Sequence, residues 1–102
     1  MELKDTVEMM GSADYQERFK AEYYQTKIRY EKLKTFNNKI AAAEITCGMR
    51  ECPPVYQAEA KTKLVEMPKH DCPAWQLREQ QRIMGEYLQI LEVRAVIEGI
   101  EL

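Results

Sequence analysis

The segment from Ser12 to Cys47 contains neither glycine nor proline, and this feature constrains the fold more than any other. Side chains suited to a helix interface recur along it at alternating spacings of four and three residues. Such a spacing places them on one face of an α-helix and is typical of a coiled coil or a helical bundle. We predict a helix over residues 14–43, with Ser12 or Asp14 as its N-cap and Glu17 as a capping-box partner. The interface positions are Phe19, Tyr23, Thr26, Tyr30, Leu33, Asn37 and Ile40.

Two of these interface positions are polar, namely Thr26 and Asn37. A buried asparagine in a helical seam costs stability, and it can select one register or one oligomeric state.

A second stripe predicts another long helix over residues 73–98. Pro73 suits its first turn, with Asp71 or Cys72 as the cap, and Gly99 suits its C-terminal end. Gly85 lies inside the predicted helix, where glycine costs about 1 kcal/mol relative to alanine. Gly85 therefore indicates close approach of a neighbouring helix or of a ligand. The stripe consists of Leu77, Gln81, Met84, Leu88, Leu91 and Ala95.

The rest of the chain has weaker patterns. We expect an N-terminal arm (1–13), an insertion (44–72) and a tail (99–102). Within the insertion, Cys47 and Gly48 break any extension of the first helix. Residues 55–66 contain good helix formers and predict a short helix within the insertion. The fold class is all-α: a single domain of two long antiparallel helices with an irregular insertion, assembled as an oligomeric helical bundle. Two such helices bury both stripes poorly on their own, so we expect a homo-oligomer, either a dimer or a higher even number.

Charge and composition exclude several classes of function. The chain has 102 residues and a net charge of −2, and its basic residues concentrate in residues 15–40, with seven Lys or Arg against three Glu. This balance argues against direct nucleic-acid binding but leaves room for a local basic site. No signal peptide and no membrane-spanning apolar run is apparent, and three cysteines suit a reducing compartment. We therefore expect a cytoplasmic protein.

No enzyme motif is apparent in the sequence. A glycine-rich phosphate loop and a HExxH pattern are both missing, and the pair of His70 and Cys72 lacks a third orienting group at a recognisable spacing. We expect a protein that is not an enzyme.

Four residues at the two ends of the insertion form a candidate metal site. Cys47, Cys52, His70 and Cys72 offer a Cys₃His set, which suits structural zinc. Their spacing departs from that of common zinc knuckles. The alternative is that the cysteines are reduced and the histidine lies on the surface, with no cofactor bound.

The first predicted helix carries a candidate ligand-binding face. Lysines and arginines alternate there with tyrosines, and Arg29 and Lys32 share one side at a spacing of three. Such a face suits a phosphate, with a tyrosine stacked on a base. The alternative is a solvated flank whose cations pair with Glu22 and Glu31.

The second predicted helix carries a polar cluster of Gln80, Met84, Tyr87 and Arg94 on one face. Arg94 beside an apolar stripe needs a partner, which is either Glu98 four residues on or a ligand.

Two stretches resemble a known family. They are Glu22-Tyr23-x-x-Thr26-x-x-Arg29-x-x-Lys32-Leu33, and Leu77-x-Glu79-Gln80-x-x-x-Met84-x-x-Tyr87-Leu88-x-x-Leu91-x-x-Arg94. Both are similar to small phage and prophage proteins related to a crAss-like phage gene product, although Thr26 replaces the usual leucine. In size and helical layout, the chain also resembles phage sponges that counter CBASS and Thoeris immunity.

These resemblances imply a counter-defence protein that sequesters a cyclic nucleotide or a cyclic ADP-ribose-type signal. Phosphates would bind Arg29, Lys32 and Arg94, a base would stack on Tyr23 or Tyr87, and Gln80 would read a base edge, with Met84 beside them. One alternative is a protein-binding inhibitor of a host defence effector, such as an anti-CRISPR. Another is a ligand-free oligomerisation module, which predicts that Arg29 and Lys32 are exposed and unpaired.

Overall fold

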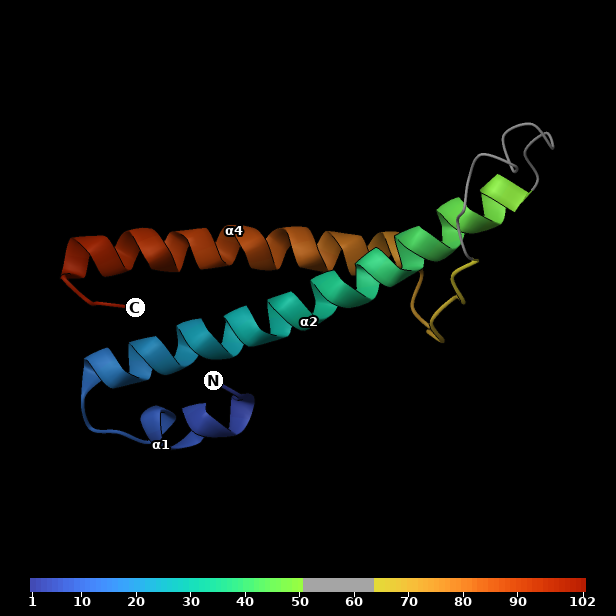
Figure 1. Cartoon of the computed structure of the whole chain (residues 1–102). Helices are drawn as coiled ribbons and strands as arrows, with labels where there is room; N and C mark the ends of the chain where they lie inside the picture. Colours follow the sequence, from blue (N-terminus) through green and yellow to red (C-terminus); the bar gives the residue numbers. More distant parts are fainter. Residues whose placement is uncertain (51–63) are drawn as a thin grey trace.

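The computed structural model describes residues 1–50 and 64–102, without the side chains of residues 48–50. Two long helices, α2 (Tyr15–Arg50) and α4 (Ala74–Glu98), run antiparallel and side by side (Figure 1). The N-terminal arm contains a short 3₁₀-helix, η1 (Leu3–Thr6), and α1 (Val7–Met10), which both pack on α2. The described residues contain no strand, so the predicted all-α fold is confirmed. Oligomeric assembly stays a prediction.

The start of helix α2 has a clear side-chain cause, and its end lies further along the chain than predicted. The Asp14 carboxylate accepts a hydrogen bond from the backbone N–H of Gln16 at 3.0 Å, so Asp14 is the predicted cap. The predicted end at residue 43 is wrong, because the helix continues through Gly48 to Arg50. A single glycine weakens a helix without stopping it. Thr46 in this extension is buried, and its hydroxyl accepts from the N–H of Val65 at 3.0 Å, which ties the returning chain to α2.

The predicted short helix over 55–66 falls mostly outside the described residues, and its last three residues, 64–66, are irregular. Helix α4 begins at Ala74, one residue later than predicted, with Pro73 as its N-cap. It ends at Gly99, whose φ of 72° is the left-handed conformation that favours glycine. The N–H of Ile100 then donates to the carbonyl of Ala95 at 2.8 Å, which returns Ile100 to the core.

The two predicted stripes form the interface between α2 and α4. Every member of both stripes is buried or half-buried, which confirms them. Burying a large apolar side chain contributes roughly 2 kcal/mol, so burial along this seam favours the packing of α2 against α4. The main cluster of buried apolar side chains consists of Phe19, Tyr23, Leu88, Leu91, Ala95 and Ile100.

Asn37 supplies the polar contact that sets the register of the two helices. Its amide donates to the side-chain oxygen of Gln81 at 2.9 Å and to the carbonyl of Leu77 at 3.1 Å. Asn37 is 6% exposed, and its side-chain oxygen, Oδ1, has no hydrogen-bond partner within the described residues. A shift in register would also leave the side-chain NH₂ group of Asn37 without a partner in the seam, and an unpaired buried donor costs about 1–3 kcal/mol.

We expect Asn37→Ala to lower the free energy of unfolding by about 1 kcal/mol, because the hydrogen bonds lost outweigh the better helix propensity of alanine. Asn38 is exposed on the same turn and is the matched control. Asn38→Ala should leave stability within about 0.5 kcal/mol. Urea unfolding followed by circular dichroism measures both variants. Equal effects at the two positions would contradict the role assigned to Asn37.

Candidate functional site

On one side of the helix pair, tyrosines and charged side chains form hydrogen bonds between α2 and α4. The Tyr87 hydroxyl donates to the carboxylate of Glu22. Two turns away, the Arg94 guanidinium donates to the Tyr15 hydroxyl at 2.8 Å. Both contacts join exposed side chains across the seam. We call this side the arginine flank, defined by Tyr15, Glu22, Arg29, Gln80, Tyr87, Arg94 and Glu98.

Arg29 and Gln80 belong to the arginine flank by helical geometry. Arg29 lies seven residues after Glu22, and Gln80 lies seven residues before Tyr87. Seven residues are two helical turns, and the helices are antiparallel, so Arg29 and Gln80 lie level two turns beyond the Glu22–Tyr87 contact. Both side chains are exposed. The structure thus places four predicted site residues along one flank: Arg29, Gln80, Tyr87 and Arg94.

Arg94 has partners of its own. Its guanidinium pairs with Glu98 at 3.3 Å and lies 5.1 Å from the ring centre of Phe19, in addition to its bond with Tyr15. The carboxylate partner predicted at i+4 is therefore present. Arg29 differs, because within residues 1–50 and 64–102 it makes no ion pair. Lys32 likewise is exposed and makes no ion pair in this part of the chain, so both residues are as the ligand-free alternative predicts, and Arg29 is also open to an anion.

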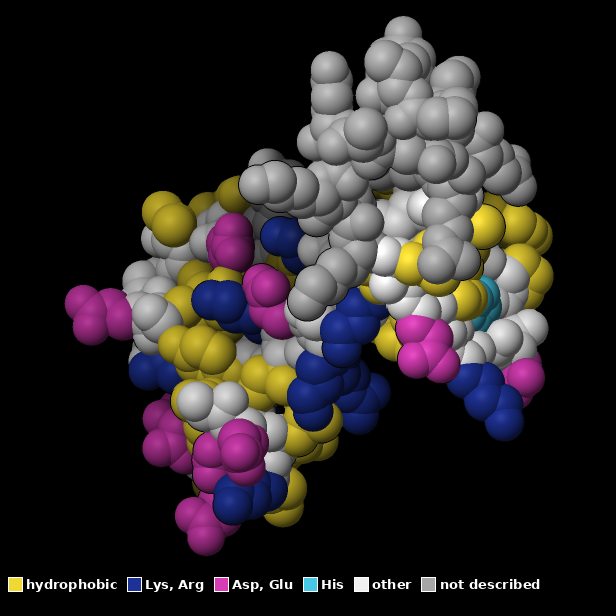
Figure 2. Space-filling model, turned by 45° about the vertical axis from the view of Figure 1, so that its right-hand side comes forward, with side chains coloured by type: hydrophobic (Ala, Val, Ile, Leu, Met, Phe, Trp, Pro, Cys, Tyr) yellow, Lys and Arg dark blue, Asp and Glu magenta, His cyan; other side chains and the backbone are white. Residues whose placement is uncertain are grey.

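The remaining three predicted residues lie elsewhere. Tyr23 lines a pocket on the opposite side of the helix pair, and Met84 is half-buried in the seam. Lys32 is exposed and lines a hollow with the N-terminal arm and Ile28. The seven residues therefore do not form one site within a single chain. Figure 2 shows one group of Lys and Arg side chains near the middle of the face that it draws, and others scattered among Asp and Glu, so the basic character of this face is local.

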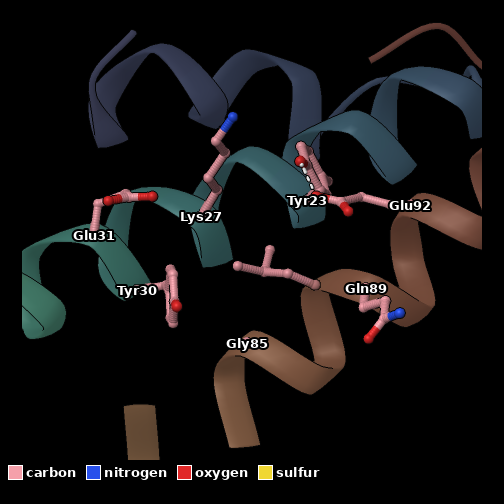
Figure 3. A pocket seen from close by; sticks show the side chains of 8 residues that line it. Tyr23, Lys27, Tyr30, Glu31, Gly85, Gln89 and Glu92 are labelled. Atoms are coloured by element: carbon pink, nitrogen blue, oxygen red, sulfur yellow. Dashed lines mark hydrogen bonds between the residues drawn. The ribbon is translucent and has the colours of Figure 1, made fainter. Parts of the chain in front are cut away.

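Figure 3 shows the pocket that contains Tyr23. Residues from α2 and α4 face each other across a cavity of about 170 Å³. Pockets that enclose a drug-sized molecule usually exceed about 300 Å³, so this one holds only part of a nucleotide. We call it the tyrosine pocket. Its lining is Tyr23, Lys27, Tyr30, Glu31, Gly85, Leu88, Gln89 and Glu92.

The charge of the tyrosine pocket suits hydroxyl groups better than phosphates. Lys27 is the cation among the lining residues, against the two carboxylates of Glu31 and Glu92. The Tyr23 hydroxyl donates to Glu92 at 2.7 Å. Burial and this hydrogen bond to a carboxylate raise the pKa of Tyr23 from 10.0 to about 12. The pocket therefore offers hydrogen-bond acceptors and aromatic faces. Lys27 belongs to the basic and aromatic face predicted for this helix, but it is not among the predicted ligand-binding residues.

Gly85 admits the ring of Tyr30 into the tyrosine pocket. A Cβ atom at Gly85 would lie 3.4 Å from the Tyr30 ring. The close approach of a neighbouring helix that Gly85 indicated is therefore confirmed, and a side chain of α2 fills the space.

The predicted zinc ligands are only partly described. Cys52 lies outside the described residues, and Cys47 and Cys72 are free thiols. The His70 ring contacts Phe36 edge-on, with ring centres 6.1 Å apart. Cys47 lies eleven residues after Phe36 on α2, which is about 16 Å along the helix axis. Cys47 is therefore far from His70, which contacts Phe36. Among the residues that the structure describes, no group of three potential ligands could hold a metal ion.

Comparison with known proteins gives one match. A family model described as Sequestin matches residues 13–48, about a third of the chain and nearly all of α2. The chain is thus similar to that family over the helix that supplies Glu22 and Arg29. No curated protein matches, and neither does any solved structure. Within the described part of the chain, no helix is both long and apolar enough to cross a bilayer.

The raised pKa of Tyr23 predicts a loss of stability in alkali. The folded state favours the neutral phenol, so the stabilisation is complete below pH 10 and disappears as the pH rises from 10 to about 12. At full extent this linkage amounts to roughly 2–3 kcal/mol. Urea unfolding between pH 8 and 12 measures it, and Tyr23→Phe should flatten the profile. An equally steep profile in Tyr23→Phe would assign the effect to other tyrosines.

Substitutions at Gly85 test the packing of Tyr30. We expect Gly85→Ala to raise the free energy of unfolding by up to about 1 kcal/mol, because alanine favours the helix and its methyl group only touches the ring. Gly85→Leu should instead cost about 1–3 kcal/mol, because the ring must move. Thermal unfolding followed by circular dichroism distinguishes the two. A stabilising Gly85→Leu would show that Tyr30 does not need this space.

Proposed function

We propose that this chain is a phage-encoded, non-enzymatic counter-defence protein that sequesters a cyclic nucleotide or a cyclic ADP-ribose-type immune signal. In this proposal the working form is a homo-oligomer, and the signal binds along the arginine flank without being chemically changed.

The observation that carries the proposal is the family match over α2, the helix that supplies Glu22 and Arg29 to this flank. The name of the matched family, Sequestin, indicates sequestration, and the match over residues 13–48 includes Glu22 and Arg29. The same flank carries the resemblance to phage proteins, because Tyr87 and Arg94 belong to the second motif. Both likenesses include α2, and residues of the arginine flank lie within both.

The chemistry of the arginine flank supports an anionic nucleotide as the ligand. Arg29 and Arg94 offer guanidinium groups, which suit phosphate oxygens, and Tyr87 offers an exposed aromatic ring for stacking. Gln80 offers a carboxamide that both donates to and accepts from a base edge. These groups lie on an open flank of one chain, so a second chain would be needed to enclose the ligand.

The proposal is tested by mixing the purified protein with cyclic dinucleotides, cyclic trinucleotides and cyclic ADP-ribose isomers. Native mass spectrometry should show a stoichiometric mass increase with one class of ligand. Denaturing the complex should then release the ligand with its mass unchanged. A ligand released with altered mass would overturn the non-enzymatic assignment. Binding to none of the panel would overturn sequestration of these signals and favour a protein target or a ligand-free module.

Arg29→Ala should weaken binding of the identified ligand at least tenfold, because a charge-assisted hydrogen bond contributes roughly 1.5–3 kcal/mol. Lys39→Ala removes an exposed cation from the same helix and is the matched control, with unchanged affinity expected. Isothermal titration calorimetry measures both, and circular dichroism checks the fold. Equal affinities would exclude Arg29 from the site. Arg94→Ala is less suitable, because it also removes the contacts with Glu98 and Phe19.

A further inference from the structure

The tyrosine pocket, on the side of the helix pair opposite the arginine flank, combines aromatic rings with charged and polar groups. Figure 3 shows Tyr23 and Tyr30 of α2 along one side of it, with Gly85 and Gln89 of α4 along the other. The two tyrosines are seven residues apart, which is about 10 Å along the helix axis. The pocket is therefore bounded by a phenol ring at each end.

Much of the hydrogen-bonding capacity of the tyrosine pocket is unused. The Tyr23 hydroxyl donates to Oε1 of Glu92 at 2.7 Å, and the other carboxylate oxygen of Glu92 has no hydrogen-bond partner in the described part of the chain. Glu31 and Lys27 are exposed, and neither makes an ion pair there. The Lys27 ammonium lies 5.8 Å from the ring centre of Tyr23 instead. The pocket thus offers carboxylate acceptors and an ammonium donor around one phenol ring.

This mixture of donors and acceptors selects among ligand groups. Phosphate oxygens only accept, and the carboxylates of Glu31 and Glu92 would repel their charge. An ammonium group only donates, and Lys27 would repel it. A hydroxyl group does both, so it can donate to a carboxylate and accept from Lys27 or from the amide of Gln89. Two neighbouring hydroxyls on one ring would use both kinds of group at once.

The size and the apolar surfaces of the pocket suit a single sugar ring. The volume of about 170 Å³ corresponds to roughly six water molecules, which leaves room for a pentose but not for a pentose together with a base. Leu88, which is 6% exposed, adds an apolar surface between the polar groups. The electron-rich faces of Tyr23 and Tyr30 suit the C–H bonds of such a ring.

We propose that the tyrosine pocket binds the vicinal hydroxyls of a ribose, with Glu92 as the principal acceptor and Lys27 as a donor. The choice of ribose over another sugar rests on the proposed function, in which the ligand is a nucleotide. The pocket and the arginine flank lie on opposite sides of one chain, so a nucleotide that uses both surfaces contacts two copies of the chain.

The tests of this subsite can be separated from the test of the proposed function. They use probes without phosphate, which gain no affinity from phosphate contacts with Arg29 or Arg94. If no probe binds, the ribose subsite is overturned and the result with cyclic nucleotides still stands. If the probes bind and no cyclic nucleotide does, the subsite stands and sequestration of those signals is overturned.

The first test titrates adenosine into ¹⁵N-labelled protein and follows the backbone amide resonances. Adenosine should shift the resonances of Gly85 and Gln89 saturably, and methyl ribofuranoside, which lacks the base, should shift the same resonances. We expect 2′-deoxyadenosine, which lacks one of the two hydroxyls, to bind at least tenfold more weakly. Equal affinities of the two nucleosides, no shift with methyl ribofuranoside, or shifts centred on Arg29 and Gln80 would overturn the proposal.

The second test measures adenosine binding to Glu92→Gln in the same way. Glutamine keeps the shape of the side chain and an oxygen for the Tyr23 hydroxyl, but it replaces the free acceptor with a donor. We expect at least a tenfold loss of affinity. Glu44→Gln removes an exposed carboxylate of α2 outside the pocket and is the matched control, with unchanged affinity expected. Circular dichroism checks that both variants remain helical, and equal affinities for the parent and Glu92→Gln would overturn the assignment of Glu92.

Discussion

The close packing of α2 against α4 is the constraint on which the rest of this structure depends. Apolar burial holds the helices together, but it is tolerant of sliding by a turn. The hydrogen bond from Asn37 to Gln81 disfavours such sliding, because the buried amide finds its partner in only one register. Once this register is set, Glu22 meets Tyr87 and Tyr15 meets Arg94 on the surface above the seam. The candidate binding flank is thus a consequence of a contact in the core.

The two sides of the helix pair differ in what they offer a ligand. The arginine flank carries guanidinium groups and an exposed tyrosine, and it is open. The tyrosine pocket is concave but small, and carboxylates outnumber its lysine. A phosphate therefore suits the first surface, while hydroxyl groups or an aromatic ring suit the second. Neither surface encloses a whole nucleotide within one chain, which is the physical reason for expecting a second chain at the site.

Sequence reasoning predicted the stripes well because heptad spacing reports directly which residues share a helix face. It predicted the end of α2 poorly, because the helix continues past Cys47 and Gly48, and the contact of Val65 with Thr46 comes from a distant part of the chain. The alternatives for Arg94 illustrate the same limit. A carboxylate at i+4 is visible in the sequence, but the stacking on Phe19 depends on how two helices meet.

The sequence by itself determined the all-α class, the two interface stripes, a cap at Ser12 or Asp14 and the turn at Gly99, because each depends on residues close together along the chain. The tertiary structure decided which predicted site residues share a surface. It placed Arg29, Gln80 and Tyr87 on one flank and Tyr23 on the other, because packing assigns each helix face either to the seam or to solvent. It also showed that Ile83, Ile90 and Ile97 of α4 are exposed, since the exposure of an apolar residue is known only after its neighbours are placed.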